Sequence, residues 1–224
     1  MRRREFVIIP IGALGGSLLR SLAEPLDRLV RLDAASDTAR VPLRFFTAAE
    51  ARVVTAACER IFPRDSNGPG AADVGVVVYI DRQLAGPYGR DKNRYTKPPF
   101  GISSPEHGYQ GADNPRALYR NGIRQLGALD ALPVNEQVAA LKAVEKTAFF
   151  TLLRAHTLEG VFCDPVHGGN ANLAGWKLVG FPGPLMDYRV HVDAHFGEAW
   201  RPAPKSLEQV TGHRFAPWED ERGE

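Results

Sequence analysis

The residues best suited to bind a metal lie near the C-terminus. His191-Val192-Asp193-Ala194-His195 places two histidines four residues apart, which is the spacing that puts two imidazoles on one helix face in zinc sites. Val192 stands where zinc proteases carry their catalytic glutamate, and no helix is indicated around the motif. We therefore expect an exposed polar segment. A stand-alone exported metal-dependent enzyme using His191, Asp193 and His195 remains the alternative.

The two cysteines are expected to differ in their surroundings. Cys58 lies on the apolar face of a predicted helix and should be buried and inert. Cys163 is expected in a loop and more exposed, where an oxidising compartment would favour a disulfide to another chain. A Cys58–Cys163 bond and a free thiol remain open. A nucleophile built from Cys163, Asp164 and His167 is disfavoured, because nucleophile and base normally come from separate elements.

The sequence lacks the motifs by which common classes of enzyme are recognised. No Gly-x-Ser-x-Gly elbow, P-loop, Gly-x-Gly-x-x-Gly turn or Cys-x-x-Cys-His haem motif occurs. His156 lies on the apolar side of a predicted helix and is expected to be a core histidine. We assign no catalytic, cofactor-binding or metal-binding residue to this chain. The formal charge of +2 also argues against nucleic acid as a partner.

The N-terminus has the composition of an export signal. Residues 1–23 combine a basic start, the uncharged run from Phe6 to Leu19 and a small-x-small triplet ending at Ala23. Arg3 and Arg4 followed by Phe6 and an aliphatic run resemble a twin-arginine signal. A frayed N-terminus or a first core helix is the alternative. Cleavage after Ala23 would remove four arginines and one glutamate, so the formal charge would change from +2 to −1.

The remaining chain is predicted to be mainly α, a compact helical core of about five helices with two long irregular loop systems rich in Gly and Pro. Residues 24–44 form a lead-in segment, and 45–224 form a single helical domain. Thr47 with Glu50 predicts a capping box, and Phe46 just before it could pack as a hydrophobic staple. Helices are predicted over 47–62, 73–84, 114–129, 135–146 and 148–159. The loop systems are 86–114 and the chain from 160 onward.

Several motifs resemble one family, the gluconate 2-dehydrogenase subunit 3 family. They occur in the family's order from Phe45 to Gly183: Phe45-Phe46-Thr47 with Ala49-Glu50, Ile61-Phe62-Pro63-Arg64-Asp65, Gly68-Pro69-Gly70-Ala71, Ile80–Tyr88, Glu159–Asn170 and Gly175–Gly183. Cys163 and Val166-His167 depart from the family pattern, so the resemblance gives the Cys163 disulfide no family-wide support. The resemblance implies the small, or gamma, subunit of a membrane-associated FAD-dependent sugar, polyol or sugar-acid dehydrogenase.

The resemblance also implies partners and a location. The chain would carry no cofactor and would pair with a large FAD-containing subunit, which works with a multihaem cytochrome c subunit. It would escort that flavoprotein through the twin-arginine machinery, stabilise it, and reside at the periplasmic face of the inner membrane. A periplasmic binding protein remains an alternative. The residues expected at the partner interface are Tyr88, Tyr95, Phe100, Tyr109, Phe162, Cys163, Asp164, His167, Gly168, Gly169, Asn170, Trp176 and Phe181. A loop folded against the chain's own helices is the alternative role of residues 159–183, and both roles are compatible.

Overall fold

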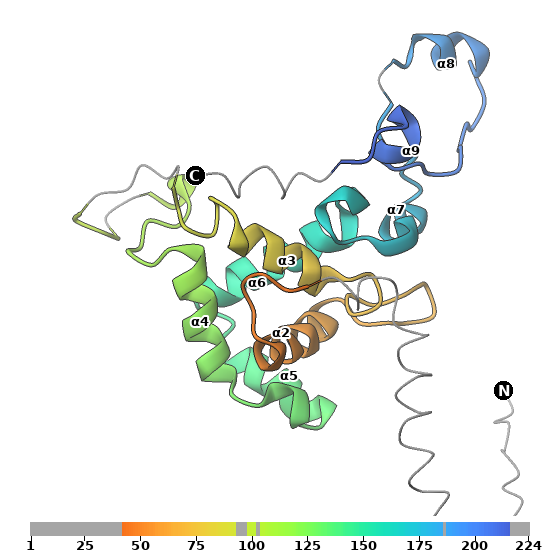
Figure 1. Cartoon of the computed structure of the whole chain (residues 1–224). Coiled ribbons are helices and arrows are strands. Elements are labelled where there is room, and N and C mark those ends of the chain that lie inside the picture. The colour runs from red at the N-terminus through yellow and green to blue at the C-terminus, as the bar shows by residue number, and fades with distance from the viewer. Residues whose placement is uncertain (1–41, 93–97, 102–103, 186, 216–224) are drawn as a thin grey trace, which may run out of the picture. The chain divides into compact units, whose positions relative to one another are not determined.

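The computed structural model describes residues 42–92, 98–101, 104–185 and 187–215, which all belong to one compact unit. These residues form helices and turns and no strand, which confirms the prediction of a mainly α fold. The predicted export signal, most of the lead-in segment and Tyr95 lie outside the described residues. The α-helices are α2 (Ala48–Ile61), α3 (Val76–Ala85), α4 (Pro115–Leu126), α5 (Val134–Ala143), α6 (Ala148–Phe162), α7 (Ala174–Val179), α8 (Arg189–Ala194) and α9 (Leu207–Thr211) (Figure 1).

Helix α2 begins as its sequence predicts. The Thr47 side chain accepts from the Glu50 amide, and the Glu50 carboxylate accepts from the Thr47 amide, so the capping box forms. Phe46, directly before the cap, is 5% exposed and packs its ring near that of Tyr119. The helix ends at Ile61, two residues before Pro63. α2 packs against α3, α4, α5 and α6 and lies at the centre of the core.

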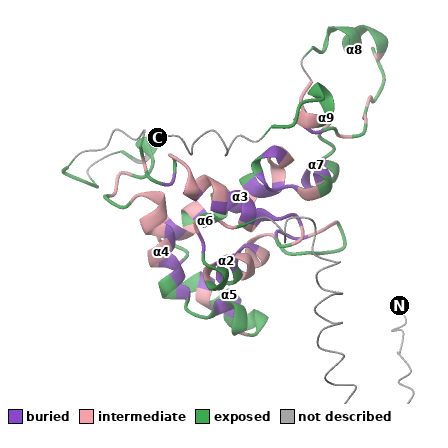
Figure 2. Ribbon diagram, viewed as in Figure 1, coloured by how far each residue is buried: buried purple, intermediate pink, exposed green. Residues whose placement is uncertain are grey.

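Helix α3 forms from the valine-rich run but starts later than predicted. Its first residue is Val76, preceded by Gly75 at a φ of 77°. Asp73 does not cap it, because its carboxylate accepts from the Gly70 amide and forms an ion pair with Arg64. A run of β-branched residues is stable as a helix here because both α2 and α6 cover it, so six of its ten residues are buried. Figure 2 shows this central burial.

Helices α4, α5 and α6 complete the core close to their predicted positions. The Asn114 side chain caps α4 by accepting from the Ala117 amide, and α4 ends before Gly127. α5 ends earlier than predicted, at Ala143, and α6 runs past the predicted end at Glu159 to Phe162. None of the described helices has the length and apolar character needed to cross a membrane.

The chain after α6 contains more helix than predicted. Two 3-10 turns, Pro165–His167 and Ala171–Leu173, lead into α7, and α8 and α9 follow. The expectation of no helix around His191 is wrong, because His191 lies in α8 and His195 caps the C-terminus of that helix. Neither α8 nor α9 has a buried residue, so both are attached to the core weakly.

Candidate functional site

Asn170 is the centre of the segment that joins α6 to α7. It is fully buried, and its backbone adopts the left-handed conformation with a φ of 49°. Its side-chain nitrogen donates to the Cys163 carbonyl at 2.8 Å, and its side-chain oxygen accepts from the Gly175 amide at 2.8 Å. Its own amide donates to the Gly160 carbonyl at 2.9 Å. One asparagine therefore fixes the end of α6 against the start of α7.

Close backbone approaches and a buried tryptophan stabilise the same segment. A Cβ atom on Gly169 would lie 2.1 Å from the Gly160 carbonyl oxygen, so no larger residue fits there without a backbone shift. Trp176 is 4% exposed, and its indole nitrogen donates to the Phe162 carbonyl at 2.7 Å. Phe181 packs edge-on against Trp176 at a centroid distance of 5.0 Å but is 42% exposed.

These contacts divide the residues of this segment that were expected at a partner interface into three groups. The buried ones serve the chain's own fold: Gly168, Gly169, Asn170 and Trp176. Phe162, Cys163 and Asp164 are half-buried, while His167 and Phe181 are exposed and available to a partner. The structure thus supports the alternative role of residues 159–183, in which this segment folds against the chain's own helices. Contact of its exposed residues with a partner stays a prediction.

Cys163 is not the exposed loop thiol that the sequence predicts. It follows the last residue of α6 and is half-buried, and burial raises the pKa of its thiol to about 12. Cys58 is buried as predicted, and burial raises the pKa of its thiol to about 12 as well. Both thiols are free, so the intramolecular bond is not formed. The Asp164 carboxylate accepts from the backbone amides of Val166 and Leu207, at 3.0 and 2.7 Å.

A hydrogen-bonded tyrosine–histidine–tyrosine chain runs from the buried Tyr119 through His156 to the surface at Tyr88. His156 on α6 is 2% exposed, which confirms the predicted core histidine. Its Nδ1 is 2.9 Å from the Tyr119 hydroxyl, and its Nε2 is 2.8 Å from the Tyr88 hydroxyl. Burial lowers the pKa of His156 to about 4, so the ring is neutral at pH 7, with one nitrogen donating and one accepting. The sequence did not reveal Tyr119 or the link between Tyr88 and His156, because the two tyrosines lie 37 and 68 positions from His156 along the chain.

Tyr88 and Tyr109, two residues of the expected interface, line one pocket of about 480 Å³. Tyr88 is 44% exposed although its hydroxyl is held by His156, and Tyr109 is 41% exposed. The third aromatic residue, Phe100, is also exposed at 41%. The other lining residues are Asp91, Gly108, Pro115, Leu118, Ala148, Thr151, Leu152 and Ala155. Apart from Asp91 and Thr151, this pocket offers an apolar wall.

The C-terminal histidines stack against Trp200. The His191 and His195 rings lie 4.2 and 4.9 Å from the Trp200 ring, centroid to centroid, and both are nearly parallel to it. His195 also lies near Glu198, with 3.7 Å between Nδ1 and the carboxylate, and Asp193 is exposed. Within the described ranges, no three His, Cys, Asp or Glu side chains are grouped so that they could hold one metal ion.

Comparison with known proteins identifies the family. Residues 48–183 match the family model described as gluconate 2-dehydrogenase subunit 3. This range covers more than half of the chain and includes the helical core and the segment around Asn170. A search of curated proteins and a search of solved structures found no match. The chain therefore belongs to the gluconate 2-dehydrogenase subunit 3 family.

Proposed function

We propose that this chain is the non-catalytic small subunit of a periplasmic FAD-dependent dehydrogenase complex. In this role it binds a large flavoprotein subunit, stabilises it and escorts it through twin-arginine export. The flavin belongs to the large subunit, and the haem belongs to a cytochrome c subunit. Membrane association is through these partners. The observation that carries the proposal is the family match over residues 48–183, because the family is named as one subunit of a dehydrogenase.

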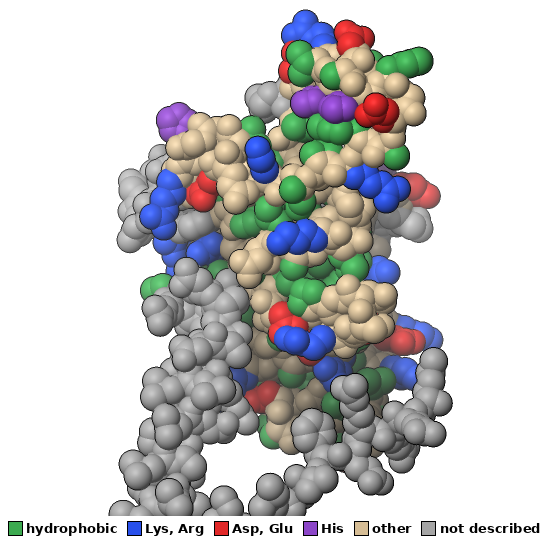
Figure 3. Space-filling model, turned by 90° about the vertical axis from the view of Figure 1, so that its right-hand side faces the viewer, with side chains coloured by type: hydrophobic (Ala, Val, Ile, Leu, Met, Phe, Trp, Pro, Cys, Tyr) green, Lys and Arg blue, Asp and Glu red, His purple; other side chains and the backbone are tan. Residues whose placement is uncertain are grey.

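The exposed apolar side chains favour a role that involves a partner. Large apolar residues reach the surface after α6, where Val179 is 59% exposed, Val190 is 66% exposed and Phe196 is 89% exposed. Figure 3 shows hydrophobic side chains among Lys and Arg side chains on one face of the described residues. Exposed apolar patches of this kind are typical of protein–protein contact surfaces.

The escort role depends on Arg3, Arg4 and Phe6. A twin-arginine signal exports proteins that have already folded, and a flavoprotein must bind its flavin before it leaves the cytoplasm. A signal on the small subunit would therefore serve both chains if they assemble first. This makes the location of the flavoprotein depend on two arginines of a different polypeptide.

The test replaces Arg3 and Arg4 with lysine and follows the flavoprotein by an epitope tag. In cells making the native small subunit, we expect the tagged flavoprotein in the periplasmic and membrane fractions. With Arg3→Lys and Arg4→Lys together, it should remain in the cytoplasm, still bound to the small subunit. Arg20→Lys, outside the pair, is the matched control and should leave export unchanged. Normal export of the flavoprotein with the double variant would contradict the escort role.

A further inference from the structure

A groove between α2, α5 and α6 is used by none of the features described above. It has a volume of about 280 Å³. Its apolar walls come from Ile61 of α2, Val138 and Leu141 of α5, and Phe150 of α6. Leu141 is 5% exposed and forms part of the core, whereas Val138 is 37% exposed. The groove is therefore an opening in the surface through which the edge of the core can be reached.

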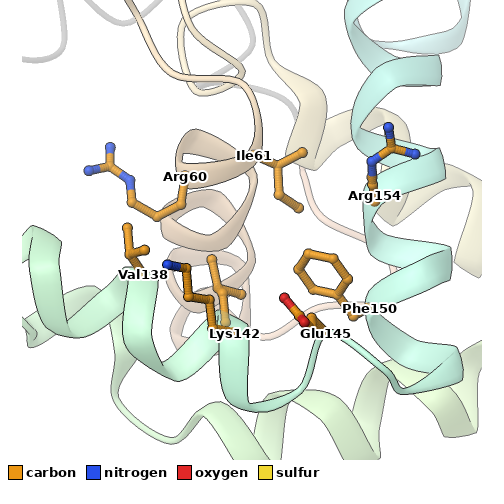
Figure 4. A pocket seen from close by; sticks show the side chains of 8 residues that line it. Arg60, Ile61, Val138, Lys142, Glu145, Phe150 and Arg154 are labelled. Atoms are coloured by element: carbon orange, nitrogen blue, oxygen red, sulfur yellow. The ribbon is translucent and has the colours of Figure 1, made fainter.

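Positive side chains surround this groove. Arg60 of α2 and Arg154 of α6 lie on opposite sides of it, with Ile61 and Phe150 between them (Figure 4). Lys142 of α5 is a third cation. Glu145 supplies a single opposing charge, which leaves an excess of two positive charges around the apolar walls.

The three cations lack acidic partners within the described part of the chain. Four other arginines there do form ion pairs with carboxylates, for example Arg52 with Asp130 at 3.1 Å and Arg120 with Glu50. Arg60, Lys142 and Arg154 form no ion pair with any described carboxylate. In addition, the Nε of Arg60 is buried and has no hydrogen-bond acceptor. A buried donor without an acceptor is destabilising, so a carboxylate or carbonyl that reaches it from the groove would be stabilised there.

Local helix electrostatics explains only part of this arrangement. Arg60 and Lys142 lie in the last turns of α2 and α5, where the helix dipole favours cations. Arg154 lies in the middle of α6 and gains nothing from that effect. The three charges come from three different helices and meet only in the folded chain, around an apolar groove.

We propose that an acidic segment of the partner flavoprotein docks in this groove, with one large apolar side chain between carboxylates that face Arg60 and Arg154. This inference rests on the proposed function and names the surface that would bind the flavoprotein. The volume is slightly below the ~300–1,000 Å³ of small-molecule sites and suits one inserted side chain. The excess of two positive charges favours binding of carboxylates. The apolar walls favour a protein segment, which has apolar side chains, over a free anion.

The test measures the release of purified, tagged flavoprotein from the immobilised full-length chain at 0.1 M salt. The groove variant carries Arg60→Glu and Arg154→Glu together. It should release the flavoprotein at least ~10-fold faster than the native chain, because truncating or reversing interfacial charges acts mainly on dissociation. Arg124→Glu with Lys205→Glu reverses two exposed charges outside the groove and should change the rate less than about twofold.

A second variant separates loss of docking from loss of folding. Val138→Asp places a carboxylate at the exposed edge of the apolar wall and removes no fully buried group. It should also speed release, while its thermal unfolding midpoint stays close to that of the native chain. Rapid release only in variants that have lost their cooperative unfolding transition would overturn the proposal.

The remaining outcomes are distinct. If the native chain captures no flavoprotein at all, the proposed function itself fails. If the native chain and the Arg60→Glu, Arg154→Glu variant release it equally slowly, only the groove assignment fails. The chain's own Trp218-Glu219-Asp220-Glu221 has similar chemistry, and so does a second copy of the chain. If the Arg60→Glu, Arg154→Glu variant and a chain truncated after Phe215 lose the same amount of thermal stability, the occupant is the chain's own C-terminal segment. If the Arg60→Glu, Arg154→Glu variant converts a dimer to a monomer, the occupant is a second copy of the chain. Either result would overturn docking of the flavoprotein.

Discussion

The neutral buried His156 should make the stability of this protein depend on pH in a defined window. Its ring is 2% exposed and hydrogen-bonded to Tyr119 and Tyr88, at 2.9 and 2.8 Å. Burial lowers its folded-state pKa to about 4, against an ordinary value of 6.5. At pH 7 the folded histidine is neutral and the unfolded one, with a pKa of 6.5, is mostly neutral, so it adds little pH dependence there.

The sign and size of the effect follow from these two pKa values. Below pH 6.5 the unfolded chain takes up a proton at His156 that the folded chain does not, so the free energy of unfolding falls. The decrease is about 1.4 kcal/mol per pH unit and continues until the folded pKa near 4 is reached. Over the whole window the loss is about 3 kcal/mol, a large part of the ~5–15 kcal/mol that stabilises a typical domain.

The measurement is urea unfolding of the full chain at several pH values between 7 and 4, followed by circular dichroism. His156→Gln removes the titrating group, and its free energy of unfolding should change little from pH 6.5 to pH 5. At pH 7 it should be less stable than the native chain by about 1–3 kcal/mol, because it loses ring packing and hydrogen bonds. Carboxylates titrate in both proteins, so the difference between the two isolates His156.

The matched control is His167→Gln, because His167 is exposed in its 3-10 turn. This variant should keep the full pH slope of the native chain. An equal slope in the native chain and in His156→Gln would refute the argument, since it would mean that the buried ring is not the group that titrates.

Two further predictions concern the core and the thiols. Asp81→Ala should lower the free energy of unfolding by about 3 kcal/mol in urea denaturation, because the buried Asp81 carboxylate accepts from the three backbone amides of residues 44–46 at 2.7–3.0 Å. A loss below about 0.5 kcal/mol would contradict this. Burial raises the thiol pKa values of Cys163 and Cys58 to about 12, so both should resist iodoacetamide at pH 8 in the native chain and react once the chain is unfolded, as measured by intact mass. Rapid modification of native Cys163 would instead support the exposed thiol and its disulfide.

Local signals in the sequence were sufficient to locate the core helices. Thr47 with Glu50 and Asn114 before Pro115 mark helix starts that the structure confirms. These caps act through backbone amides within three residues, so no distant contact is needed for them to work. The start of α3 was misplaced because Asp73 binds Gly70 and Arg64 instead of capping the helix.

The sequence predicted the candidate site less well than it predicted the core helices. The aromatic and glycine residues of segment 159–183 were recognised as important, yet their types did not reveal which of them face inward. Trp176 is suited equally to an interface and to a core, and its burial and its hydrogen bond to the Phe162 carbonyl show that it is internal. Likewise Cys163 looks like a loop residue in sequence, but α6 extends to Phe162 and half buries it.

The sequence by itself determined the helical class, the starts of most core helices and the family to which the chain belongs, because capping, periodicity and motifs are read within a few neighbouring residues. Only the tertiary structure decided which side chains are buried and which charges gather together. The link from His156 to Tyr88, and the grouping of Arg60, Lys142 and Arg154 around one groove, join residues from separate elements. Such contacts depend on how whole helices pack, and packing is decided by the shape and burial of the entire core rather than by any local pattern.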